Sequence, residues 1–220
     1  MGLIGGIGPA ATDYYYRRII AAYAESDLDL ELTIAHADAP TLLRNLQNDD
    51  RKSQVEIYTR LTDRLKTAGA DFVAVTSIAG HFCIEEFKDR SPLPVIDLIE
   101  AVREDVELKG FSRLGILGTE KVMRSEFYGR LGKIKVVTPS PGLLENVHTA
   151  YVAMASSGLV TAPQREMLNA ACTELMEDFG VDAVLLGSTD LALIYDEETS
   201  LFPIVDCAAI HSLKIVSASW

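Results

Sequence analysis

The amino-acid sequence predicts an α/β protein made of two similar lobes, each built on a mostly parallel sheet. Short apolar runs rich in β-branched residues alternate with longer stretches of helical period, which is the pattern of βα units. The chain also repeats itself: residues 68–77 and 179–189 each read as a helix end, a glycine, an aspartate, a buried strand and a Ser/Thr pair. A fainter echo links residues 2–8 with residues 114–119. We therefore expect one lobe from residues 1–98 plus 206–220 and a second lobe from residues 99–205.

The individual elements follow from this alternation in chain order. We expect strands at Met1–Ile4, Glu31–His36, Phe72–Thr76, Pro94–Ile96, Arg113–Leu117, Lys135–Val137, Ala183–Leu186 and Ile204–Val205. We expect helices at Ala10–Ala24, Asp50–Ala68, Ile84–Arg90, Leu98–Lys109, Lys121–Leu131, Leu143–Ser156, Ala162–Phe179 and from Cys207 onward. Gly69, Gly110 and Gly180 each stand between a helix and a strand, where a left-handed C-cap is expected. The acidic runs 27–31 and 196–198 are interpreted as solvated loop charge.

Composition excludes several classes of function. With 220 residues and a net charge of −12, the chain is globular material that lacks the basic face needed for nucleic acid or an anionic membrane surface. No apolar run approaches the roughly 20 residues that span a bilayer. The opening residues lack the basic region of a signal peptide, so we expect a cytoplasmic protein. Cys83, Cys172 and Cys207 have no metal-binding spacing, and we interpret them as buried hydrophobes.

Four turns are candidates for the functional site, because ligands bind beyond the carboxyl ends of the strands in open parallel sheets. These turns are Gly5–Thr12, Thr76–His81, Gly118–Glu120 and Gly187–Asp190. The first turn carries Gly6 and Gly8 and opens a helix, so its amides and the helix end favour a small anion such as a carboxylate. It matches neither the GxGxxG nor the Walker pattern, and a merely tight turn is the alternative.

Three types of side chain could carry chemistry in these turns. His81 could exchange a proton near neutral pH, although a single histidine is often structural. Ser77 and Ser188 occupy equivalent places in the two lobes, where hydroxyl groups also serve as helix caps. Arg44 is the best cation for gripping a carboxylate, with a solvated surface arginine as the equal alternative. For His36 and His211, a core or surface role is favoured.

The turns, taken in order, resemble those of the aspartate/glutamate racemase family, and the resemblance spans almost the whole chain. It rests on residues 5–15, 68–75, 117–128, 187–190 and 203–211. The resemblance implies two flavodoxin-like lobes with the site in the cleft between them, and chemistry that needs neither pyridoxal phosphate nor a metal ion. In that family two thiols flank the substrate α-carbon, one removing a proton while the other supplies one.

This sequence departs from the family where those thiols are expected. Ser77 and Ser188 stand in place of the two cysteines, Ile78 and Ala79 replace Asn and Thr, and Asp190 replaces Glu. No lysine follows the helix that contains Tyr151. A serine hydroxyl is far less acidic than a thiol and needs a neighbouring base to be activated.

The leading hypothesis is a cofactor-independent, racemase-like isomerase that acts on a small carboxylate or amino acid such as aspartate or glutamate. Its catalytic residues would be Ser77, Ser188 and His81, and its substrate-binding residues Gly6, Gly8, Thr12, Arg44, Thr119 and Thr189. No metal site is expected. One alternative is a ligand-binding homologue that has lost the reaction, and another is a hydrolase or lyase with Ser77 as nucleophile and His81 as base. Enzymes of this kind are most often homodimers, which is the expectation here.

Overall fold

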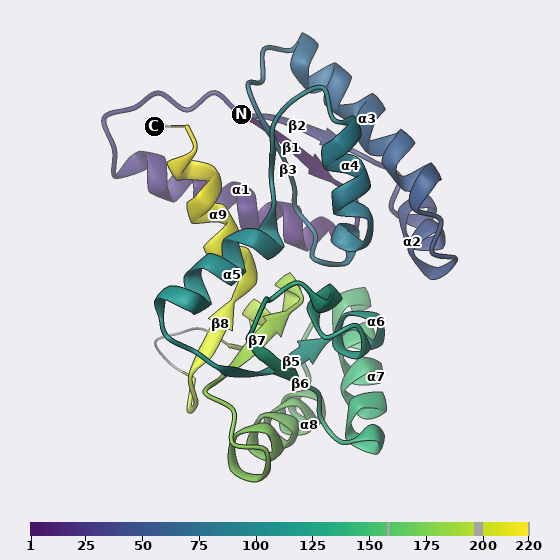
Figure 1. Ribbon diagram of the computed structural model, residues 1–220, viewed down its shortest axis with the longest axis vertical. Coiled ribbons are helices and arrows are strands. Elements are labelled where there is room, and N and C mark those ends of the chain that lie inside the picture. Colours follow the sequence, from purple (N-terminus) through teal and green to yellow (C-terminus); the bar gives the residue numbers. More distant parts are fainter. Residues whose placement is uncertain (158, 196–199, 220) are drawn as a thin grey trace. The chain divides into compact units, whose positions relative to one another are not determined.

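The computed structural model describes residues 1–157, 159–195 and 200–219, and the contacts within it divide the chain into two compact units (Figure 1). Unit 1 contains Met1–Ala101 and Ala208–Trp220, and unit 2 contains Val102–Cys207. The chain leaves unit 1 inside helix α5 (Leu98–Leu108) and returns where strand β8 (Ile204–Asp206) meets helix α9 (Cys207–Ser217). The lobe boundaries expected from the sequence, at residues 98/99 and 205/206, remain a prediction. The acidic run 196–198 lies outside the described residues.

Unit 1 is a four-stranded parallel sheet with helices. Its strands are β1 (Gly2–Gly5), β2 (Thr33–His36), β3 (Val73–Val75) and β4 (Val95–Ile96), in the order β2-β1-β3-β4. The register pairs Gly2 with both Thr33 and Val73. Its helices are α1 (Pro9–Ala24), α2 (Ala39–Gln47), α3 (Arg51–Thr67), α4 (Ile84–Arg90) and α9.

Unit 2 has the same arrangement of strands. Its strands are β5 (Arg113–Gly118), β6 (Lys135–Val137), β7 (Ala183–Gly187) and β8, in the order β6-β5-β7-β8, all parallel. Its helices are most of α5 together with α6 (Glu120–Arg124), α7 (Pro141–Ser157) and α8 (Ala162–Thr173). Strand for strand, β5, β6, β7 and β8 take the places of β1, β2, β3 and β4. The predicted fold class, two similar parallel α/β lobes, is confirmed.

The packing of unit 1 explains why its elements form where they do. One core cluster joins Leu3 of β1 with Tyr15 and Ile19 of α1 and with Ile215 of α9, all of them fully buried. The C-terminal helix therefore completes the core of the unit that begins the chain. The glycines at 69, 110 and 180 have φ values of 92°, 73° and 59°, so the three predicted left-handed C-caps are confirmed. Within the described residues, no helix has the length and apolar character needed to cross a membrane.

One helix was missed, and two predicted helices need correction. Helix α2 was not predicted, although Asp38 caps it by accepting a hydrogen bond from the Thr41 amide at 3.0 Å. The helix predicted at Lys121–Leu131 ends at Arg124, because Glu126, Phe127 and Tyr128 all have positive φ. The helix predicted at Ala162–Phe179 is α-helical only to Thr173 and continues as a π-helical turn over Glu174–Asp178.

Candidate functional site

The glycine loop after β1 needs glycine at two positions for steric reasons. Gly6 and Gly8 have φ values of 147° and 74°, conformations that side chains rarely adopt. A Cβ atom on Gly6 would also lie 2.9 Å from the carbonyl oxygen of Ala37 and 2.7 Å from the Leu42 side chain. The loop thus folds back onto the chain that follows β2, with helix α1 starting at its end.

Thr12, in the first turn of α1, is tied to the end of β3. Its Oγ1 atom lies 3.0 Å from Oγ1 of Thr76, and the Thr76 hydroxyl donates to the carbonyl oxygen of Ile4 at 3.2 Å. Because the Thr76 hydroxyl donates its single proton to Ile4, the Thr12 hydroxyl is the donor in its hydrogen bond with Thr76. The structure therefore brings the predicted binding residue Thr12 to the strand end that carries Ser77.

Ser77 is buried in the turn that leads from β3 into a 3₁₀ helix, Ala79–Cys83. Its Oγ atom accepts a hydrogen bond from the amide of Gly80 at 3.3 Å. This is the capping role that a hydroxyl at a strand end commonly plays. Among the described residues, no acidic or basic side chain forms a hydrogen bond with this hydroxyl.

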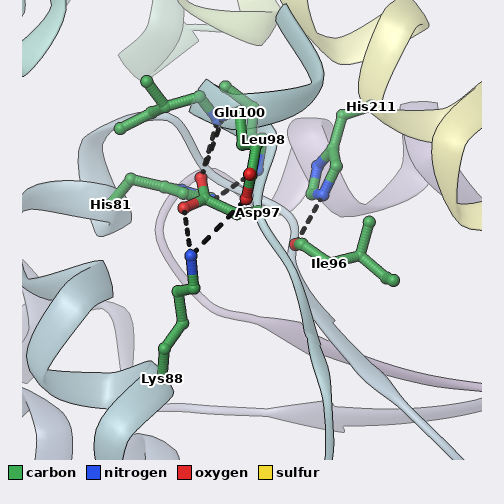
Figure 2. Close-up of polar contacts among 8 residues, drawn as sticks. His81, Lys88, Ile96, Asp97, Leu98, Glu100 and His211 are labelled. Carbon is green, nitrogen blue, oxygen red and sulfur yellow. Dashed lines mark hydrogen bonds and ion pairs between the residues drawn. The ribbon is translucent and has the colours of Figure 1, made fainter. Parts of the chain in front are cut away.

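His81 is buried and both of its ring nitrogens are hydrogen-bonded to the backbone, one of them to Leu98 as Figure 2 shows. Nε2 accepts from the amide of Leu98 at 3.3 Å, so this nitrogen carries no proton. Nδ1 therefore holds the proton and donates it to the carbonyl oxygen of Ser77, 2.6 Å away. The imidazole contacts the Ser77 backbone, which gives no support to the interpretation of His81 as the base of a Ser77 nucleophile.

A second buried histidine stands beside the first. The rings of His81 and His211 meet edge to face with centroids 5.9 Å apart. Nδ1 of His211 accepts from the hydroxyl of Tyr15 at 2.8 Å, and Nε2 donates to the carbonyl oxygen of Ile96 at 2.9 Å (Figure 2). Burial, with the neighbouring His81 as a smaller cause, lowers the pKa of His211 to about 3. The ring is therefore neutral and buried, which is one of the two roles, core or surface, favoured from the sequence.

Asp97 fixes the start of α5 in the same region (Figure 2). Its carboxylate accepts from the amides of Ile99 at 2.9 Å and Glu100 at 3.3 Å, and Lys88 lies 3.3 Å away. The residue before the helix thus caps it, while His81 receives the amide of the next residue, Leu98. This polar cluster holds the end of β4 and the start of α5 against the Ser77 turn.

In unit 2, Ser188 belongs to a chain of three buried polar side chains. Its hydroxyl donates to the hydroxyl oxygen of Tyr151 at 2.5 Å, and the Tyr151 hydroxyl donates to Oδ2 of Asp190 at 2.9 Å. Burial, followed by the nearby Asp190 charge, raises the pKa of the Tyr151 phenol. Tyr151 lies on α7, 37 residues before Ser188. Because the two residues are so far apart in the sequence, nothing local in the sequence signals this contact.

The remaining predicted residues have different surroundings. Thr119 caps α6 by accepting from the amide of Val122 at 3.3 Å, so a structural role accounts for its hydroxyl. Thr189 is buried beside Ser188. Arg44 is exposed on α2 and donates to the Thr41 hydroxyl at 3.3 Å; within the described chain it bonds to none of the other predicted site residues.

A pocket of about 270 Å³ adjoins the first strand end. It is lined by Thr12, Asp13, Tyr16, Ile34 and His36. Thr12, Asp13 and Tyr16 come from the first turns of α1, and Ile34 and His36 from one face of β2. Apart from Thr12, these lining residues were not predicted, because an edge strand and an exposed helix face have no sequence signal that distinguishes a pocket from solvent.

The cysteines are buried, as expected, and burial raises the pKa of Cys83 and of Cys172 to about 12. Neither is a ready thiolate. In the described part of the chain, no group of three or more His, Cys, Asp or Glu side chains is arranged to hold a metal ion.

Comparison with known proteins gives a consistent result. The model of the Asp/Glu/hydantoin racemase family matches residues 4–214. The broad specificity amino-acid racemase of Bacillus subtilis (strain 168) is 22% identical over 231 residues, covering 99% of this chain and 96% of that protein.

Two solved structures share the fold. An aspartate racemase homologue from Pyrococcus horikoshii OT3 has a TM-score of 0.85 at 24% identity, covering 99% of this chain and 97% of that one. The aspartate racemase of Picrophilus torridus has a TM-score of 0.73 at 20% identity, covering 99% and 94%.

Proposed function

The chain belongs to the Asp/Glu/hydantoin racemase family, and from this premise we propose that it is a cofactor-independent amino-acid racemase-like isomerase acting on a small carboxylate such as aspartate or glutamate. The reaction moves the α-proton of the substrate. Ser77 and Ser188 are the two proton-transfer positions, standing where the family resemblance places its thiols.

One observation carries this proposal, which is the equivalence of the two strand ends. Ser77 follows β3 and Ser188 follows β7, and these are the third strands of two sheets with the same order. Both side chains are buried, at 7% and 8% exposure, although serine is usually an exposed residue. Two hydroxyl groups held at matching positions suit a reaction that treats two mirror-image substrates alike.

The loops after the first strands support the binding half of the proposal. The glycine loop with Gly6, Gly8 and Thr12 follows β1, and Thr119 follows β5. The positive end of a helix dipole favours the carboxylate that every amino acid carries. We assign substrate contacts to these residues and to Thr189, and a weaker one to Arg44, which bonds to its own helix. His81 serves by shaping the Ser77 turn.

The direct test is exchange of the substrate α-proton for deuterium in heavy water, followed by mass spectrometry and chiral chromatography. Aspartate and glutamate come first, followed by a panel of other amino acids. We expect deuterium at the α-carbon together with the opposite enantiomer, and loss of the inversion in both the Ser77→Ala and the Ser188→Ala variants. Absence of exchange at high enzyme concentration would reject the isomerase for the substrates tested.

The Ser125→Ala variant is a matched control. Ser125 caps the end of helix α6, and its hydroxyl donates to the carbonyl oxygen of Val122. The substitution therefore removes a half-buried serine hydroxyl that lies away from both strand ends. Exchange should persist in this variant. Tight binding of substrate by calorimetry with no exchange would instead identify a ligand-binding homologue.

We also propose a homodimer, the commonest assembly among soluble proteins. Sedimentation equilibrium would test it, since one chain has a mass of 24.0 kDa. A particle of that mass at micromolar concentration would contradict a dimer.

A further inference from the structure

We propose that Ser188, Tyr151 and Asp190 form a proton relay in which the Asp190 carboxylate is the terminal base for the Ser188 hydroxyl. The inference rests on the proposed function for its place in the reaction, while the relay is a property of unit 2 alone. It adds Tyr151 and Asp190 as positioning residues for Ser188.

The geometry sets the direction of the relay. The two hydrogen bonds, of 2.5 Å and 2.9 Å, both donate away from Ser188 and end on the carboxylate. All three residues are at most 8% exposed. Aligned hydrogen bonds in a poorly hydrated site polarise one another, and a bond to an ionised acceptor is stronger than a neutral one.

The surroundings keep the Tyr151 phenol in the state that the relay needs. Burial and the nearby Asp190 raise the pKa of the Tyr151 phenol, so the phenol stays protonated at neutral pH. A neutral phenol can receive a proton from Ser188 while it passes its own to Asp190. A phenolate would instead repel the carboxylate.

The transfer step balances without any co-reactant. As Oγ of Ser188 takes the substrate α-proton, the original Oγ proton moves to Oη of Tyr151. The original Oη proton then moves to Oδ2 of Asp190. The electron pair of the broken C–H bond stays on the substrate carbon, so the negative charge passes from Asp190 to the substrate. Protonation of the carbon by Ser188 on the same face reverses each transfer and gives exchange without inversion, whereas inversion requires a proton from the opposite face.

Among the residues that the structure describes, Ser77 has no equivalent relay, which makes the two serines different. Its hydroxyl accepts from the amide of Gly80, and His81 is turned to its carbonyl oxygen. A serine is activated only where a base can take its proton. In the described residues that condition is met at Ser188 and not at Ser77, so Ser77 serves as the internal reference.

The test is labelling by an alkyl fluorophosphonate, which needs no knowledge of the substrate. Oγ of Ser188 forms a bond to phosphorus, fluoride leaves with its electron pair, and the hydroxyl proton passes through Tyr151 to Asp190 and then to water. Peptide mass spectrometry gives the labelling rate of each serine. We expect Ser188 to label faster than Ser77, and its rate to fall at least tenfold in Tyr151→Phe and in Asp190→Asn.

The two variants interrupt the relay in different ways. Phenylalanine removes the hydroxyl link, whereas asparagine keeps a hydrogen-bond acceptor and removes only the base. Because the relay acts as one unit, the double variant should label no more slowly than the slower single variant. Asp190→Asn also protects the test against a Tyr151→Phe variant that fails to fold.

Tyr195→Phe is the matched control, because Tyr195 is a buried tyrosine of the same unit whose hydroxyl donates to Asn169 at 2.9 Å. In the Tyr195→Phe variant, the reagent should label Ser188 at the wild-type rate. No labelling of Ser188 in the wild type, or equal rates in all variants, would overturn the relay.

Comparing serine labelling with α-proton exchange allows the relay and the isomerase activity to be rejected independently. Relay-dependent labelling without exchange removes the isomerase for the substrates tested and keeps the relay. Exchange together with a labelling rate that does not change in the Tyr151 and Asp190 variants rejects the relay and keeps the isomerase.

Discussion

The Nδ1 atom of His81 lies 2.6 Å from the carbonyl oxygen of Ser77, and the other ring nitrogen receives the amide of Leu98. The imidazole therefore bridges the turn after β3 and the start of α5. Both of its nitrogens are hydrogen-bonded to backbone groups of buried residues.

Through these two hydrogen bonds, His81 stabilises the fold of unit 1. We predict that His81→Ala lowers the free energy of unfolding by about 2–4 kcal/mol, since it removes the hydrogen bonds of His81 to two buried residues and opens a cavity. Urea unfolding followed by circular dichroism measures the loss. His81→Gln, which keeps an acceptor for Leu98, should recover part of it. A loss below about 1 kcal/mol in the alanine variant would contradict the bridge.

His211 should make the protein sensitive to acid. Its pKa is lowered by burial from 6.5 to about 3 in the folded state, so below pH 6.5 the unfolded chain binds a proton that the folded chain does not. The stabilising contribution is thus complete above pH 6.5 and is lost as the pH falls towards 3, by about 1.4 kcal/mol per pH unit.

The measurement compares wild type with His211→Asn across this range of pH. Carboxylates also titrate there, but they are shared by both proteins, so the difference isolates His211. We expect the wild type to lose stability more steeply with acid. Parallel curves would show that the histidine is not held neutral.

Gly187, where β7 ends, has no room for a side chain. A Cβ atom there would lie 2.6 Å from the carbonyl oxygen of Leu117, a backbone atom that cannot rotate away. We predict that Gly187→Ala destabilises unit 2 by at least about 2 kcal/mol, as seen for overpacked cores. Gly142→Ala in α7 is the control, because nothing lies within 4 Å of that position. Thermal unfolding of the two variants should differ clearly.

The relay predicts an isotopic asymmetry if the protein is an isomerase. Within the described part of the chain, Ser188 is linked to a base and Ser77 is not, and on the proposed mechanism each serine serves one face of the α-carbon. Deuterium should therefore enter one starting enantiomer several times faster than the other, before any inversion. NMR of each recovered enantiomer measures this exchange. Equal exchange from both sides would mean that the two serines are equally activated.

Much of the fold could be predicted because its signals are local. All eight strands found in the described residues lie where apolar, β-branched runs occur, and the glycine C-caps were visible as single residues. Helix α2 was missed because Pro40 and the polar residues around it read as a turn, whereas Asp38 and two buried leucines, Leu42 and Leu46, stabilise a helix. The consecutive positive φ angles after α6 arise from packing and have no sequence signature.

The candidate site was predictable only in part, because its chemistry depends on contacts between distant residues. The rule that ligands bind at strand ends selected Ser77, Ser188 and Thr12. It could not reveal that His81 faces a carbonyl group. Nor could it reveal the phenol of Tyr151 beside Ser188, since the two residues are brought together by the packing of α7.

The insertion of unit 2 between residues 101 and 208 has a consequence for synthesis on the ribosome. Residues 102–207 emerge as one uninterrupted stretch and can begin to fold as soon as they leave the exit tunnel. The core of unit 1 must wait, since Ala208, Ile215 and Val216 of α9 belong to it and are translated afterwards. The part of the chain made first is thus the last to be completed, and its exposed apolar surface is what a chaperone would meet in the interval.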